Sequence, residues 1–261
     1  MDYELLLNEV MNIGKEMIKS GAETDRAEDS MYRMLESYDV EQCSIFAIQS
    51  DIQATIKPAE GSFITQIRRV HKIGLNYDRL DYLNNLSRYI CKNKPDIREI
   101  HEKYEEVMNR RPQPLYLKYL SAILGGIGFG VYFGCDLMDS LAGTVICAIC
   151  IVYMGNVLEK KGYNLVVYNL SLAFLSSAAV FILDKAGMGH HPDRIVLGLN
   201  MVLISGLGVA NGIRDVLKQA FLSGLLSIVN SFLGAVAIAC GTGPAMVLFE
   251  GEMYEMYIAP S

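Results

Sequence analysis

Residues 195–219 read IVLGLNMVLISGLGVANGIRDVLKQ, and this stretch combines a long apolar run with ionisable side chains. The surrounding region, 195–249, contains three formal charges, Arg214, Asp215 and Lys218, and all three lie within the quoted stretch. Apolar runs of this length are typical of membrane helices, in which a charge costs free energy unless it lies near the interface or faces water. The stretch therefore predicts a membrane domain that contains one polar feature.

Charged residues divide the chain into two unlike halves. Residues 1–114 contain 20 acidic and 16 basic side chains, whereas residues 115–261 contain 9 and 7. We therefore predict a soluble domain (1–114), a membrane domain (115–249) and a short acidic tail (250–261). The net charge of −6 and the lack of a basic stripe with interleaved aromatic residues argue against a nucleic-acid partner.

Five uncharged runs predict five transmembrane helices. The middle three have 19 residues each and would span about 28 Å as helices, close to the roughly 30 Å of a hydrocarbon core. The last run contains Gly241-Thr-Gly-Pro244, so its helix is expected to end near Cys240. Buried helices of a large soluble protein are the alternative. The runs are 119–134, 140–158, 165–183, 195–213 and 219–249.

Lysines and arginines beside these spans predict the orientation of the chain. With the N-terminus inside, the cytoplasmic flanks hold seven basic residues and the outer loops hold two. The positive-inside rule then favours a cytoplasmic N-terminus and an extracytoplasmic C-terminus. The acidic start MDYELLLNEV lacks the basic region of a signal peptide, which also favours a cytoplasmic first domain.

Small and polar residues in the spans predict how the helices associate. Glycines four residues apart allow close backbone approach, as at Gly126, Gly130 and Gly134 and at Gly208 and Gly212. Asparagines at membrane depth either bond between helices or line a substrate path, namely Asn156, Asn169, Asn200, Asn211 and Asn230. The scattered cysteines and His190-His191 lack metal-site spacing, so no metal or cofactor is expected.

The soluble half predicts an α+β domain of order ααβββαα. Residues 3–20 and the run ETDRAEDSMYRMLESY place apolar side chains at helical spacing. CSIFAIQS, IQATIKP and SFITQIRRV have the alternation of strands, and two helices follow near 78–92 and 96–109. Ser20 and Glu23 have the spacing of a capping box for the second helix.

A polar cluster is expected within this domain. Its carboxylates and guanidiniums either stabilise the domain or form a regulatory or hydrolytic pocket. The sequence contains no nucleophile in a triad setting and no Walker-type loop, so no catalytic residue is predicted. The cluster comprises Glu23, Thr24, Arg26, Asp29, Arg69 and Arg88.

Three separated motifs resemble the threonine/serine exporter family in order and approximate spacing. They are SGAETDRAED, QIRRVHKIGLNYDRLDYLNNLSR and GLGVANGIRDVLKQAFLSG, and the resemblance covers residues 5–245. The family's fused form has a cytoplasmic N-terminal domain and about ten membrane helices. This chain is similar to the separate N-terminal half of the split form. Ser205-Gly206 stands where the family pattern has proline–glycine, so the sequence departs from that pattern at the expected helix break.

The resemblance implies that the chain is a multi-pass protein of the bacterial cytoplasmic membrane that exports threonine or serine by secondary transport. It would work together with a smaller membrane subunit of the same family. Relatives of the split form are associated with dicarboxylates such as succinate, which are the alternative substrates. A membrane-anchored enzyme and a regulator that use the N-terminal domain are further alternatives. If the partner also contributes five helices, the two halves would be inverted relative to one another.

The ionisable residues of the opening stretch allow two interpretations. They form either a short cytoplasmic turn between spans four and five or a polar re-entrant segment that faces the substrate path. In the second case Arg214 would bind the carboxylate of an amino acid and Asp215 its ammonium, and proton coupling through Asp215 is a related hypothesis. The expected path residues are Asn200, Ser205, Gly206, Asn211, Arg214, Asp215 and Asn230.

Overall fold

A computed structural model describes residues 1–71, 74–111, 114–137, 152, 157, 164–185 and 191–258. Contacts divide the chain into two compact units, one formed by residues 1–111 and 210–228, the other by residues 112–209 and 229–261. The first unit therefore includes a segment that lies within the apolar half of the sequence. Most described residues are helical, and they include one three-stranded sheet.

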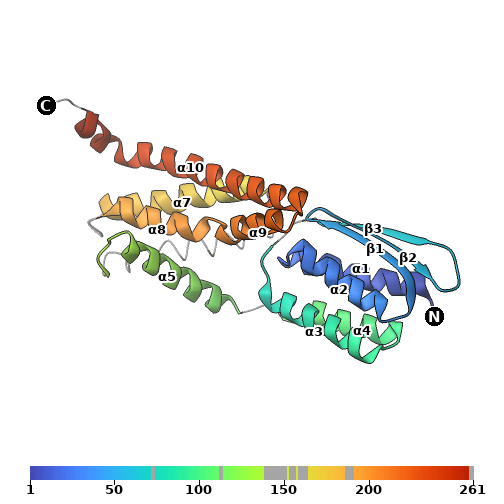
Figure 1. The fold of residues 1–261 in the computed structure, drawn as a ribbon. Coiled ribbons are helices and arrows are strands. Elements are labelled where there is room, and N and C mark those ends of the chain that lie inside the picture. Colours follow the sequence, from blue (N-terminus) through green and yellow to red (C-terminus); the bar gives the residue numbers. More distant parts are fainter. Residues whose placement is uncertain are drawn as a thin grey trace. The chain divides into compact units, whose positions relative to one another are not determined.

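The N-terminal part of the first unit has the predicted order of elements (Figure 1). Helices α3 and α4 pack on the side of α1 and α2 that faces away from the sheet, so this part has three layers. The elements are α1 (Tyr3–Lys19), α2 (Thr24–Glu36), β1 (Val40–Ile48), β2 (Asp51–Pro58), β3 (Ile64–Arg69), α3 (Tyr77–Asn93) and α4 (Ile97–Met108).

Apolar side chains at helical spacing form the core of this part, as predicted. Leu6, Val10 and Ile13 of α1 are fully buried, and so are Met31 and Leu35 of α2. The period-2 pattern of β2 places its alternate apolar residues against these helices. Burial of the apolar faces of α1 and α2, rather than helix propensity alone, stabilises these two helices.

The sheet is antiparallel with strand order β1-β2-β3. Ile48 pairs with Asp51 across the first hairpin, and Asp51 pairs with Arg69 across the next pair of strands. Arg69 is exposed on this edge strand. Among the described residues, the ion-pair partners of Glu23 are Arg26, Arg214 and Lys218, so Arg69 does not pair with the carboxylate with which the sequence grouped it.

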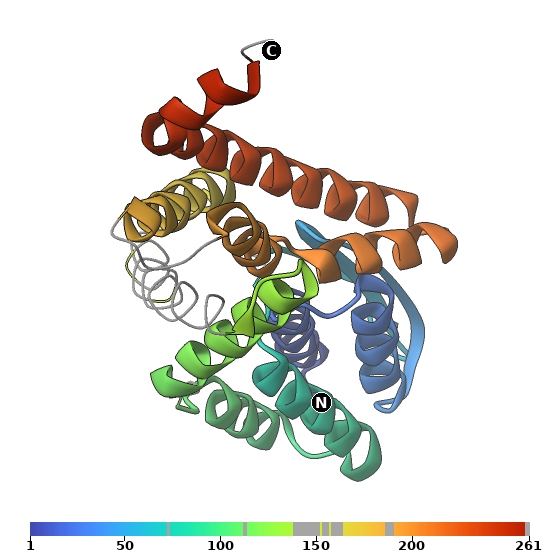
Figure 2. The same cartoon turned by 90° about the vertical axis from the view of Figure 1, so that its left-hand side faces the viewer.

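The second unit contains α5 (Leu115–Tyr132), α7 (Leu165–Lys185), α8 (Pro192–Leu203) and most of α10 (Phe221–Ile258). Helix α8 contacts both α5 and α7 (Figure 2). A Cβ added at Gly198 of α8 would lie 2.9 Å from the backbone nitrogen of Gly130 on α5. The glycine spacing therefore allows close helix packing, which confirms that role for Gly130.

Three described helices are long and apolar enough to cross a membrane, at Leu115–Tyr132, Val166–Lys185 and Phe221–Phe249. If the bent pair of α8 and α9 (Gly206–Leu217) is counted as one span, the described residues contain four candidate membrane spans. Apart from positions 152 and 157, the expected span 140–158 with Asn156 lies outside the described residues. The count of five therefore stays a prediction.

The expected end of the last helix near Cys240 is wrong. Helix α10 continues through Gly241-Thr-Gly-Pro244 to Ile258. A Cβ at Gly241 would lie 2.4 Å from the carbonyl oxygen of Leu170 on α7, so this glycine permits close packing and does not terminate the helix. Pro244 removes one backbone donor, and a long helix in membrane surroundings tolerates this loss.

Candidate functional site

The fourth expected span is broken between α8 and α9. Helix α8 ends at Leu203, Ile204 is extended, and α9 begins at Gly206 with its axis bent by 48°. The Ser205 carbonyl accepts hydrogen bonds from the amides of Gly208 and Val209, which are the first bonds of α9. Serine can thus start the new helix in the position where the family pattern has proline.

The interpretation of 206–219 as a simple turn is wrong for most of this segment. Residues 206–217 form α9, and the connection to α10 is limited to residues 218–220, where Gln219 has a φ of 68°. Helices α9 and α10 then approach closely, because a Cβ at Gly224 would lie 2.6 Å from the carbonyl oxygen of Gly212. Glycines therefore bring the two helices together next to the ionisable residues.

Arg214 forms an ion pair with Glu23, which immediately precedes α2. The Lys218 ammonium lies 3.3 Å from a carboxylate oxygen of Glu23 and 2.9 Å from one of Asp25. The Glu23 side chain is only 10% exposed. Two cations of the apolar half therefore bind two carboxylates at the start of α2, within the first compact unit.

The expected capping box of α2 is wrong. Glu23 itself is the N-cap residue and its side chain makes no capping hydrogen bond, while Ser20 is the C-cap of α1. Burial would raise the pKa of Glu23, but hydrogen bonds from Arg214 and Lys218 outweigh it and leave the pKa below its ordinary value. Glu23 is therefore held as a carboxylate for these two cations.

A Glu23→Gln variant should be less stable than the native chain at pH 7, by about 2–4 °C in Tm if the pair contributes about 1 kcal/mol. Because the folded-state pKa is lowered, this contribution is present above the unfolded pKa near 4.5 and is lost as the pH falls through the folded value. Thermal unfolding of the full chain in detergent at pH 7 and at about pH 3.5 measures the difference. Glu102→Gln on exposed α4 is the control, and an equal Tm loss at both pH values would contradict the assignment.

Asp215 points to a different environment from Arg214, as expected for successive residues of a helix. It is 2% exposed, and its Oδ2 accepts a hydrogen bond of 3.2 Å from the Ser223 hydroxyl. The Ser223 oxygen lies 3.0 Å from the Thr24 hydroxyl. Since Ser223 donates its single proton to Asp215, Thr24 is the donor to Ser223.

The other oxygen of this carboxylate, Asp215 Oδ1, is buried and has no hydrogen-bond partner among the described residues. An unsatisfied buried acceptor costs about 1–3 kcal/mol, so such an atom needs an explanation. A proton or a cationic group of a ligand would satisfy it. We refer to Glu23, Thr24, Asp25, Arg214, Asp215, Lys218 and Ser223 as the α2–α9 site.

The structure brings together only part of the expected substrate path. Asn200 bonds to Thr242 of α10 at 3.1 Å, in the second unit, which matches a hydrogen bond between helices. Ser205 and Gly206 are exposed at the break, and Asn230 is exposed on α10. Asn211 is half-buried on α9. Of the seven expected path residues, Arg214 and Asp215 belong to the α2–α9 site.

The expected polar cluster of the N-terminal domain divides in the same way. Glu23 and Thr24 join the α2–α9 site, whereas Arg26, Asp29 and Arg88 line a separate pocket between α2 and α3. Arg26 still lies 3.6 Å from Glu23, on the exposed side. Among the described residues, no group of three or more histidine, cysteine or acidic side chains could hold a metal ion.

Sequence reasoning missed the hydroxyl groups of α10. Ser223 and Ser227 lie one helical turn apart and are both buried, and Ser227 bonds to Gln49 of the loop between β1 and β2. The signal was present as two serines on one helix face on either side of Gly224. It could be read only once the partners of that face were known.

Residues 9–249 match the family model described as "Putative threonine/serine exporter". The chain belongs to the threonine/serine exporter family. No curated protein and no solved structure matches it.

Membership of this exporter family, together with the apolar helices, makes the chain a multi-pass membrane protein. The family match includes both segments that form the α2–α9 site, since Glu23 and Ser223 lie within residues 9–249. In this family member Arg214 and Lys218 of the apolar half thus have their ion-pair partners in the N-terminal domain.

Proposed function

We propose that the chain is one subunit of a secondary transporter that exports threonine and serine across the bacterial cytoplasmic membrane. Its partner is a smaller membrane subunit of the same family. The observation that carries this proposal is the α2–α9 site, where Arg214 and the buried Asp215 lie on the second half of a broken helix of the apolar half. Broken helices with ionisable groups are typical of substrate sites in secondary transporters.

The groups of this site suit a hydroxylated amino acid. Arg214 can bind a carboxylate, the unpartnered oxygen of Asp215 can accept from an ammonium, and Ser223 can bond a hydroxyl. Glu23 and Thr24 now supply a carboxylate to Arg214 and a hydroxyl to Ser223. In this proposal the start of α2 occupies the positions of substrate groups and must move away before threonine binds.

The five spans predicted from the sequence and the distribution of basic residues support a cytoplasmic N-terminus and an extracytoplasmic C-terminus. A five-helix partner would then be inverted relative to this subunit. Reporter fusions at the C-terminus of the full chain test this topology. A reporter that is active in the cytoplasm would overturn both the odd number of spans and the inverted arrangement.

The function is tested in proteoliposomes that contain the chain and its partner subunit. Counterflow of labelled threonine and serine is expected, with succinate as the comparison. Exchange of succinate alone would assign the complex to dicarboxylates, for which Asp215 is unfavourable unless it is protonated. Binding of the amino acids without flux would favour the regulator alternative.

Asp215→Asn is expected to remove the pH dependence of transport, because an amide at this position cannot take up or release a proton. Counterflow and net export should be measured over a range of pH for both proteins. Asp193→Asn, at the exposed start of α8, is the matched control and should keep the native pH profile. An unchanged profile in Asp215→Asn would exclude proton coupling through this residue.

A further inference from the structure

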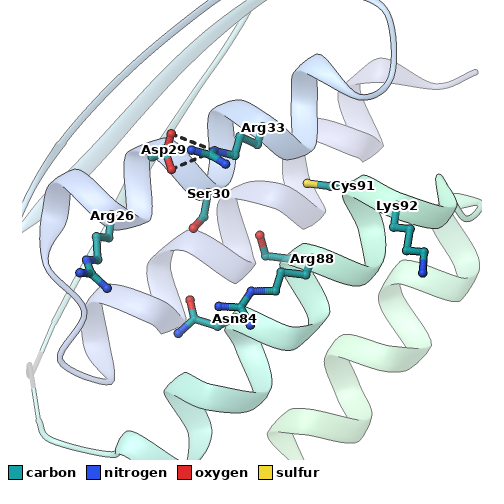
Figure 3. A pocket seen from close by; sticks show the side chains of 9 residues that line it. Arg26, Asp29, Ser30, Arg33, Asn84, Arg88, Cys91 and Lys92 are labelled. Atoms are coloured by element: carbon teal, nitrogen blue, oxygen red, sulfur yellow. Dashed lines mark hydrogen bonds and ion pairs between the residues drawn. The ribbon is translucent and has the colours of Figure 1, made fainter.

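A second polar site lies in the N-terminal domain between α2 and α3. It is a pocket of about 520 Å³, and in Figure 3 Ser30 of α2 faces Asn84 and Arg88 of α3, whereas the Lys92 side chain points away from α2. It shares no residue with the α2–α9 site, so it stands apart from the transport proposal. The lining residues are Arg26, Asp29, Ser30, Arg33, Asn84, Ser87, Arg88, Cys91 and Lys92.

Positive charge dominates the lining of this pocket. Four of the nine residues are arginine or lysine and one is an aspartate, which gives a formal net charge of +3. The aspartate, Asp29, is already bound by Arg33 through contacts of 2.9 and 3.0 Å (Figure 3). Arg26 lies 3.6 Å from Glu23, outside the pocket, whereas Arg88 and Lys92 have no carboxylate in the lining to neutralise them.

Arg88 and Lys92 lie one turn apart on α3 and have no hydrogen bond or ion pair with other residues of the described chain. Like charges at this spacing repel each other and destabilise a helix by a few tenths of a kcal/mol. A domain with ample acidic residues could have paired these cations, as it does with Lys103 and Glu99 on α4. Both line the pocket instead, and unpaired cations at a cavity are the arrangement expected of an anion site.

Neutral donors complete the lining. The Ser87 residue is 6% exposed and lies in the pocket wall with Ser30 and Asn84, and such hydroxyl and amide groups can donate to anion oxygens. Burial raises the pKa of the Cys91 thiol, and the nearby Arg33 offsets this only in part. None of the nine lining residues is a histidine that could activate a serine. The chemistry of the lining therefore favours binding over hydrolysis.

We propose that this pocket binds a small dianionic oxyanion, with Arg88 as its principal charged ligand and with Lys92 and Arg26 at its edge. Phosphate and a dicarboxylate share the required chemistry, since both present several oxygens with two negative charges. A zwitterionic amino acid is disfavoured, because its ammonium group would meet a pocket of net positive charge. The ligand of this pocket thus differs in class from the proposed transport substrate.

The test is isothermal titration of the full chain in detergent with inorganic phosphate, succinate and serine as separate probes. Saturable binding of phosphate or succinate is expected, and the stronger of the two identifies the class of the natural ligand. Arg88→Gln should weaken that binding about tenfold to a hundredfold, the range for loss of one charge-assisted contact. Arg98→Gln, on exposed α4 and outside the pocket, removes the same charge and should bind like the native chain.

Lys92→Gln, at an exposed position of the same helix, gives a second variant in case Arg88→Gln does not fold. The proposal is overturned if neither dianion binds, if serine binds as well as they do, or if the pocket variants and Arg98→Gln bind equally. These measurements need no flux. A failure of transport and a failure of this pocket can therefore be told apart.

Discussion

Arg214→Gln is expected to lower threonine counterflow about 100-fold. The variant removes the guanidinium that we propose binds the substrate carboxylate, and loss of a charge-assisted, paired contact of this type costs about 3 kcal/mol. It also leaves Glu23, which is 10% exposed, with Lys218 as its remaining partner in the α9 region. Initial rates in proteoliposomes, normalised to the amount of folded protein, measure the effect.

A charge exchange separates the two roles of this arginine. The double variant Glu23→Arg with Arg214→Glu keeps an ion pair between α2 and α9 but places a carboxylate where the substrate carboxylate should bind. Transport should stay low although thermal stability recovers. If the exchanged pair restores transport, Arg214 acts only by holding α2, and the proposed substrate contact is wrong. Arg98→Gln controls for the loss of one positive charge.

Gly224→Ala is expected to cause the largest loss of stability. Its Cβ would lie 2.6 Å from the carbonyl oxygen of Gly212 and 2.8 Å from the backbone nitrogen of Val216. Backbone atoms cannot move aside by changing a rotamer, so α9 and α10 must separate. Overpacking of this kind costs about 2–3 kcal/mol, and we expect the Tm to fall by about 5–10 °C.

Gly243→Ala on the same helix is the matched control. A Cβ at Gly243 would have no atom within 4 Å, so this variant gains only the higher helix propensity of alanine, up to about 1 kcal/mol. Thermal unfolding of the full chain in detergent measures both variants. Equal Tm values for the two would show that the close approach of α9 and α10 does not exist.

Much of the N-terminal fold could be predicted from local patterns. Leu6, Val10 and Ile13 repeat at helical spacing and are buried as expected, and the strand pattern of IQATIKP places alternate residues in the core. Such patterns are readable because the periods of helix and strand depend on backbone geometry alone. Motifs that mark helix ends were less reliable, since Ser20 and Glu23 have the spacing of a capping box that the structure does not form.

Composition and periodicity by themselves determined that a charged α+β segment precedes an apolar helical one, and that Arg214 and Asp215 are exceptional within it. Only the tertiary structure decided what these residues contact. Glu23 and Arg214 are 191 positions apart, and no local period relates them. The same holds for Gly241, which resembles a helix terminator until α7 is placed against it. Contacts between residues that are distant in the sequence depend on how separate helices and strands pack. A sequence pattern describes only one helix or strand at a time.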